Sequence, residues 1–116
     1  MNMGNEKRWP QAIRNVLEAV LGPRGESARE ERQAMHDYAR AAAGVDTDNF
    51  EVSAALSPYI EKLTHSPYKV IERDLDALRA AGYSEDQIFE LTLAGALGAA
   101  AGRYERTLDL LYGDDE

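Results

Sequence analysis

Side chains that could do chemistry gather between residues 61 and 73. Lys69 and Arg73 are cations four residues apart, so on one helix both could face an anionic ligand. His65 can change protonation near neutral pH. If the chain binds a small anionic molecule, we expect the contacts to come from Glu61, His65, Ser66, Tyr68, Lys69 and Arg73.

Two more specific chemistries are weaker interpretations of the same residues. Glu61 and His65 have the i, i+4 spacing of two metal ligands, but a site needs a third ligand and His36 is the only other histidine. Ser66-x-x-Lys69 matches a serine–lysine nucleophile pair, a pattern so short that it arises by chance. The plain alternative is a solvated helix end. We therefore expect no metal and no cofactor, and we assign no catalytic residue.

Composition narrows the classes of function. The 116 residues suit a single domain, 1–116, with residues 1–8 and 113–116 flexible. A net charge of −8 disfavours nucleic acid and anionic membrane surfaces as partners. The absence of cysteine excludes disulfides and thiol catalysis. No apolar run is long enough for a signal peptide or a membrane span, so we expect a cytoplasmic protein.

Apolar periodicity predicts an all-α fold of about five or six helices. The first begins near Pro10 and ends at Gly22-Pro23, and the second spans about 27–43 and stops at Gly44. A capping box at 48–51 would open the third. Pro58 should kink or break it, with Ser57 capping a new helix. A short helix closed by Gly82 follows.

A capping box at 84–87 opens the longest predicted helix, about 85–112. Its middle is small and apolar nearly all the way round, which indicates burial on several sides. Gly95, Gly98 and Gly102 form one face where another helix can approach closely. That face could pack within one subunit. We favour a contact between subunits, because a chain of this length has little interior.

The run DALRAAGYSEDQIFELTLAGALGAAAGRYERTLDLL, with SPYKV upstream, resembles the alkylhydroperoxidase D-like and carboxymuconolactone decarboxylase superfamily over roughly residues 49–112. The resemblance implies an all-helical oligomer, a trimer or a hexamer. It also implies that SPYKV stands where thiol-active members carry a Cys-x-x-Cys-x-x-x-His motif. One register places Ser66, Lys69 and Arg73 on that motif, and the other places Pro67, Val70 and Asp74 there. Neither supplies a thiol or the histidine, and the expected proton-relaying glutamate falls near Ala54 or Ala55.

The resemblance is to a divergent member of the superfamily that has no cysteine, and two hypotheses follow from it. The first is a non-redox homo-oligomeric scaffold, or a small-molecule-binding protein without peroxidase activity. The second is a decarboxylase-like lyase or isomerase that acts on an anionic molecule by acid–base chemistry near His65 and Lys69. An enclosed pocket with converging Lys69 and Arg73 would favour the second, and exposed side chains would favour the first. In either case we expect the stretch 66–71 to be a helix junction.

Overall fold

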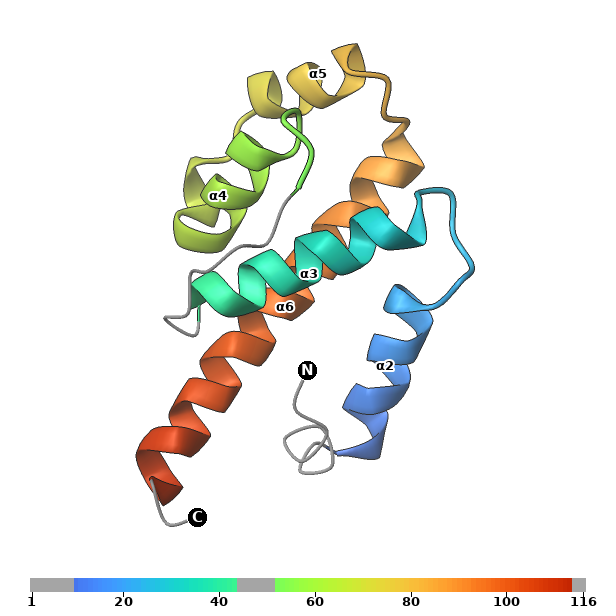
Figure 1. Ribbon diagram of the computed structural model, residues 1–116. Helices are drawn as coiled ribbons and strands as arrows, with labels where there is room; N and C mark the ends of the chain where they lie inside the picture. The colour runs from blue at the N-terminus through green and yellow to red at the C-terminus, as the bar shows by residue number, and fades with distance from the viewer. Residues whose placement is uncertain (1–9, 44–51, 114–116) are drawn as a thin grey trace.

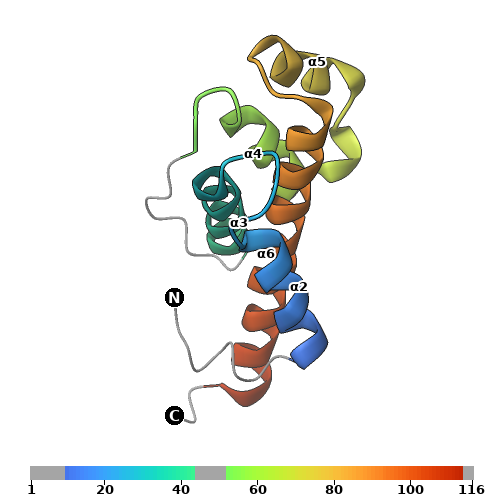
Figure 2. The same ribbon diagram turned by 90° about the vertical axis from the view of Figure 1, so that its right-hand side faces the viewer.

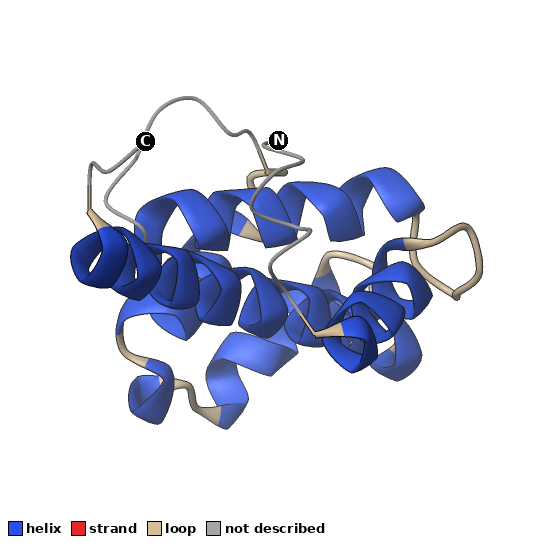
Figure 3. Ribbon diagram, turned by 90° about the horizontal axis from the view of Figure 1, so that it is seen from below, coloured by secondary structure: helices blue, strands red, loops and turns tan. Residues whose placement is uncertain are grey.

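The structure is a computed structural model that describes residues 10–43 and 52–113. These residues form five α-helices and one short 3-10 helix, and they include no strand (Figures 1 and 3). The all-α prediction is confirmed. The elements are α2 (Gln11–Leu21), α3 (Arg29–Ala43), α4 (Ser57–His65), η1 (Pro67–Lys69), α5 (Glu72–Ala80) and α6 (Glu85–Tyr112).

Most predicted helix ends are confirmed because local signals set them. Pro10 precedes the first turn of α2, and Gly22 follows its last residue. Gly82 has a positive φ of 106° just after α5, a conformation that glycine adopts at low cost. At the start of α6, the Ser84 hydroxyl accepts a hydrogen bond from Gln87 N while the Gln87 side chain accepts one from Ser84 N.

The prediction around Pro58 needs a correction. Residues 52–56 form no helix: α4 begins at Ser57 with Leu56 as its N-cap, and no side chain caps it. The break occurs because proline is tolerated only in the first turn of a helix, where its missing N–H would be unpaired anyway. The predicted stop at Gly44 and the predicted capping box at 48–51 lie outside the described residues. So do the segments predicted to be flexible, 1–8 and 113–116, except for Gly113.

The core forms where α3 crosses α6, with α4 packed on the same side (Figures 1 and 2). A Cβ added at Gly98 would lie 2.0 Å from the His36 carbonyl oxygen, and one at Gly102 would lie 2.3 Å from that of Arg40. Gly95 faces Ile60 and Leu63 of α4 instead. The glycine face is therefore filled within one chain, and our expectation that it forms a subunit contact is wrong. Glycine lets the two backbones touch here.

The long axis of the molecule follows α6. The principal extents are 48 × 28 × 24 Å, and 28 helical residues span about 42 Å. The C-terminal end of α6 projects past α3 and α4 (Figures 1 and 2), and α2 comes near α6 at residues 97–104. Within the described ranges, no helix is long and apolar enough to cross a bilayer. The projecting end leaves apolar side chains without cover: Leu110 is 69% exposed, Leu111 67% and Tyr112 58%.

Candidate functional site

The stretch 66–71 is a helix junction, as expected. Ser66 follows the last residue of α4, and residues 67–69 form a single 3-10 turn in which Lys69 N donates to Ser66 O at 2.8 Å. Val70 is extended, with φ −67° and ψ 128°. Lys69 and Arg73 therefore lie in different elements. They do not share one helical face, because the extended Val70 breaks the helical phase between them.

The predicted binding residues do not converge on a cavity among the described hollows, which other residues line. Five of them, Glu61, His65, Tyr68, Lys69 and Arg73, are exposed, and Ser66 is half-buried. Tyr68 is 82% exposed, and the Lys69 ammonium lies 5.9 Å from its ring centroid. An exposed cation–π contact of this kind contributes only about 0.5–1 kcal/mol. Binding of an anion here stays a prediction.

Glu61 has a structural partner. The Tyr38 hydroxyl on α3 donates to the Glu61 carboxylate on α4, which joins the two helices. This hydrogen bond, with some burial, raises the pKa of Tyr38 to about 12. Lys62, the next residue on α4, donates to both oxygens of Asp74 at 3.0 Å and so connects α4 to α5. Glu61, Lys62 and Asp74 thus join neighbouring helices.

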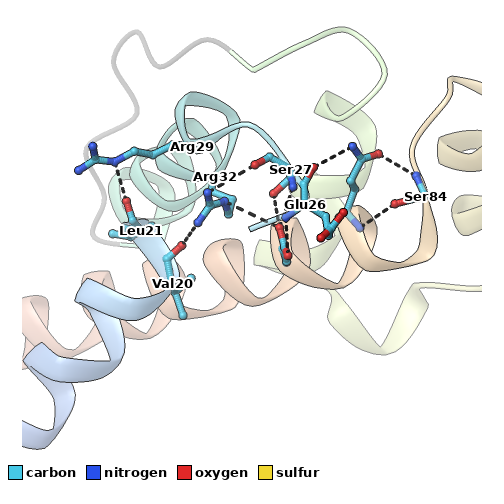
Figure 4. Close-up of polar contacts among 9 residues, drawn as sticks. Val20, Leu21, Glu26, Ser27, Arg29, Arg32 and Ser84 are labelled. Carbon is cyan, nitrogen blue, oxygen red and sulfur yellow. Dashed lines mark hydrogen bonds and ion pairs between the residues drawn. The ribbon is translucent and has the colours of Figure 1, made fainter. Parts of the chain in front are cut away.

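The most elaborate polar cluster in the described residues surrounds Glu90 on α6 (Figure 4). Its carboxylate accepts hydrogen bonds from Glu26 N and Ser27 N at 2.8 Å, and from the Ser27 hydroxyl at 2.7 Å. Arg32, whose side chain is 2% exposed, lies 4.0 Å away and donates to Val20 O. The cluster therefore holds the α2–α3 loop against α6.

These donors change the acidity of Glu90. The backbone hydrogen bond from Glu26 N lowers the pKa of Glu90 most; burial opposes the shift, and the bonds from Ser27 and the charge of Arg32 favour it. Gly25 lies against the cluster, since a Cβ there would be 2.8 Å from Glu90 Oε1, and its φ is 147°. The sequence did not predict this cluster because Glu90 is more than sixty positions away from Glu26 and Ser27. The only local signal was Gly25, before the acidic first turn of α3, and it indicates no more than a turn.

The second feature of α6 is an apolar strip on the side away from the glycine face. The α6 strip consists of Leu97, Ala100, Tyr104, Leu108 and Leu111, whose spacings of three and four residues put them on one side of the helix. Leu111 and Ala100 are exposed, Tyr104 is 39% exposed, and Leu97 and Leu108 are half-buried. No member of the strip is charged.

α2 covers the strip only in part. A hollow of about 340 Å³ separates the two helices, lined by Ile13, Val16, Leu17, Leu97, Ala100, Ala101 and Tyr104. Ile13 and Val16 are each 46% exposed, and α2 has no fully buried residue. An amphipathic helix in a globular protein usually buries its apolar face against the core. Here the face stays open at one end.

Comparison with protein-family models, with curated proteins and with solved structures finds no match to this chain. The function must therefore be argued from the geometry. Across residues 10–43 and 52–113, no three histidine, aspartate or glutamate side chains come together in a way that could hold a metal ion. Of the features described above, the α6 strip with the adjoining side of α2 is the one with exposed apolar surface over several helical turns, and such surface is typical of a protein–protein contact.

Proposed function

We propose that the protein is a non-redox helical scaffold that assembles with itself through the α6 strip and the neighbouring side of α2. The observation that carries this proposal is the partial exposure of the uncharged α6 strip, in which Leu111 is 67% exposed, on a helix whose opposite face is already filled by α3. Water contact with such a strip costs roughly 25 cal/mol per Å² of apolar surface, and association removes that cost.

The chemistry of the chain also favours a role without catalysis. The sequence has no cysteine, so a thiol peroxidase or disulfide reductase mechanism has no nucleophile. The lyase alternative needs an acid–base group beside a cationic anchor in an enclosed place. Lys69 and Arg73 are exposed on separate elements, which argues for the scaffold over the lyase.

Sedimentation equilibrium of the full chain and of two neighbouring variants tests the proposal. Leu111 and Leu110 are almost equally exposed, at 67% and 69%, but only Leu111 belongs to the α6 strip. We expect the wild-type chain to associate at micromolar concentration. Leu111→Glu should raise the dissociation constant at least tenfold, about 1.4 kcal/mol, because a carboxylate would be desolvated in the contact.

Leu110→Glu is the matched control. It adds the same charge one position away, on a different side of α6, and should change the dissociation constant by less than about threefold, under ~1 kcal/mol. A wild-type chain that stays monomeric at 100-fold higher concentration would refute the proposal. So would equal losses of association in the two variants. Circular dichroism of each variant establishes that the helices are retained.

A further inference from the structure

A larger hollow, distinct from the one beside the α6 strip, lies between α2 and α3. Its volume of about 450 Å³ is in the range of small-molecule sites. The lining comes from one side of α2, from the turn after that helix and from the first turns of α3. Its charged, amide and large apolar members are Arg14, Leu17, Glu18, Leu21, Arg29 and Gln33.

Two arginines reach this hollow from different helices and keep unused donors. Arg14 on α2 donates from Nη2 to Gln11 at 2.7 Å. Arg29 on α3 donates from Nε to Leu21 O at 3.0 Å (Figure 4), which holds its guanidinium beside the last residue of α2. Both terminal nitrogens of Arg29 have no partner in the described part of the chain. A guanidinium in this state presents the paired N–H groups that fit a carboxylate.

The hollow also holds a carboxylate that neither arginine neutralises. Glu18 lies four positions after Arg14, a spacing that favours an ion pair on a helix. Across residues 10–43 and 52–113, however, the Glu18 carboxylate forms no ion pair or hydrogen bond, and neither does the Gln33 amide. The hollow therefore offers positive, negative and amide groups together, beside the half-buried Leu17 and Leu21.

We infer that this hollow binds a small zwitterion, an α-amino acid with an apolar side chain. Arg29 and Arg14 bind its carboxylate, and Glu18 binds its ammonium group. Its side chain lies on Leu17 and Leu21. The site uses none of the α6 strip, so this inference goes beyond the proposed function and does not depend on it.

Other ligands leave part of the lining unmatched. An anion would pair with the two arginines but would place its charge beside Glu18, and like charges repel. A cation would meet two guanidinium groups. An uncharged apolar molecule would remove water from three charged groups and return no polar contact, which is unfavourable. A zwitterion satisfies both signs of charge at once.

Two other hollows of the described residues lack this combination. The one beside the α6 strip has no charged residue in its lining. A smaller one of about 160 Å³ is lined by Glu30 and Glu31 and has no cation to oppose them. Only opposite charges in one hollow can select a ligand that carries both, so the mixed lining is what points to a zwitterion.

An NMR titration of the isotope-labelled full chain with L-leucine tests the site. Because the charges lie at an open surface, we expect a Kd on the order of 1 mM. The shifts should concentrate in residues 14–22 and 29–33. Isocaproate has the same carboxylate and branched chain without the ammonium group, and isoamylamine has the ammonium group without the carboxylate. Each should bind about fivefold more weakly than L-leucine.

Three variants locate the binding. Arg29→Gln should raise the Kd for L-leucine about fivefold, because the donors to the carboxylate are lost. Arg24→Gln is the matched control: it removes the same charge from an exposed residue of the preceding loop that does not line the hollow, and should change the Kd less than about twofold. Glu18→Gln should weaken L-leucine about fivefold without weakening isocaproate, a difference that a purely structural role would not produce.

The outcomes are decisive. Shifts that do not saturate with L-leucine up to about 20 mM would overturn the site. Isocaproate binding as tightly as L-leucine would overturn its assignment to a zwitterion. Equal losses in Arg29→Gln and Arg24→Gln would show a dependence on overall charge alone and would also overturn it. If Arg29→Gln loosens α2 by losing its bond to Leu21, Glu18→Gln still decides, because the Glu18 side chain has no contact to lose. Self-association, measured by sedimentation, is unaffected by any of these results.

Discussion

Glu90 shows how one carboxylate can hold a loop. Its side chain is 24% exposed, yet it accepts hydrogen bonds from two backbone amides and one hydroxyl of the α2–α3 loop. Arg32 supplies the nearest positive charge and also donates to Val20 O and Ser27 O. Glu26 and Ser27 lie in the α2–α3 loop, outside any helix. We therefore expect loss of the Glu90 acceptor to loosen the contact of this loop, and of α2 before it, with α6.

Glu90→Gln should destabilise the fold. The amide keeps the shape of the side chain but presents only one acceptor to three donors, and hydrogen bonds to charged groups contribute about 1.5–3 kcal/mol. We expect a loss of about 1–3 kcal/mol in denaturant unfolding. Glu85→Gln is the control, because Glu85 is 71% exposed and pairs with Arg79 at the surface. Its effect should stay below about 1 kcal/mol.

The effect of Glu90 should depend on pH in a defined direction. The pKa of Glu90 is lowered in the folded state, so its stabilising contribution is complete above the ordinary value of about 4.3 and is lost as the pH falls through the lowered pKa. The difference in unfolding free energy between the wild-type chain and Glu90→Gln should therefore be constant from pH 6 to 8 and shrink below about pH 4. A difference that grows on acidification would contradict this account.

At the scale of the elements, the contact of α3 with α6 organises the molecule. Gly98 and Gly102 remove the side chains that would hold the two backbones apart, and the Arg40 guanidinium reaches Glu105 at 2.7 Å and 2.5 Å farther along the same contact. The glycines cost helix stability, up to about 1 kcal/mol each relative to alanine. Packing against α3 offsets that cost.

Gly98→Ala should destabilise the fold, although a glycine-to-alanine change in a helix usually stabilises it. In an exposed helix the substitution stabilises by about 0.5–1 kcal/mol. At Gly98 the new Cβ would meet the His36 backbone at 2.0 Å, so the helices must separate, and we expect a loss of about 1–3 kcal/mol in thermal or denaturant unfolding. Ala96→Leu adds more bulk at an exposed position of α6 and should change stability by less than about 0.5 kcal/mol. Equal effects of the two would disprove the close crossing.

α5 has one fully buried residue, Leu78. Leu78 is 1% exposed, so Leu78→Ala should cost about 2–5 kcal/mol, whereas half-buried Leu75 should cost less. Lys69→Ala and Arg73→Ala remove exposed charges and should stay within about 0.5 kcal/mol. Unfolding of the four variants in denaturant provides the comparison. If the charge deletions prove as damaging as Leu78→Ala, the stretch 66–71 is more than a junction.

For the whole molecule, charge and shape act together on assembly. Each chain carries a net charge of −8, so two copies repel one another over most of their surface, and the proposed contact through the uncharged α6 strip must overcome that repulsion. The C-terminal end of α6, which carries Leu108 and Leu111 of the strip, projects past α3 and α4 (Figure 1).

Salt should therefore strengthen self-association. Raising NaCl from about 0.05 M to 0.5 M shortens the screening length well below 10 Å and weakens the repulsion between like-charged copies. We expect the dissociation constant measured by sedimentation to fall severalfold. Leu111→Glu should remain weaker than the wild-type chain at every salt concentration, because its defect lies in the contact itself. Association that weakens with salt would instead indicate attraction between opposite charges.

Local interactions explain why the sequence predicted so much of the secondary structure. Pro10, Gly82 and the Ser84–Gln87 box act within a few residues of themselves, so the ends of α2, α5 and α6 could be predicted before any packing was known. The same holds for the turn after His65, because proline constrains its neighbour whatever surrounds it. The sequence correctly predicted a helix junction at 66–71. The i, i+4 spacing of Lys69 and Arg73 has no helical meaning, however, because the extended Val70 lies between them.

Contacts between distant residues required the folded chain. The sequence showed that one face of α6 admits a close neighbour, but not that α3 supplies it, because a glycine face accepts a helix of its own chain or of another equally well. The sequence also could not predict that Glu90 contacts the loop at 25–27, because a contact between residues more than sixty positions apart has no local sequence signal. Once α3 and α4 occupy one side of α6, the remaining apolar side chains, from Leu97 to Leu111, form the open strip.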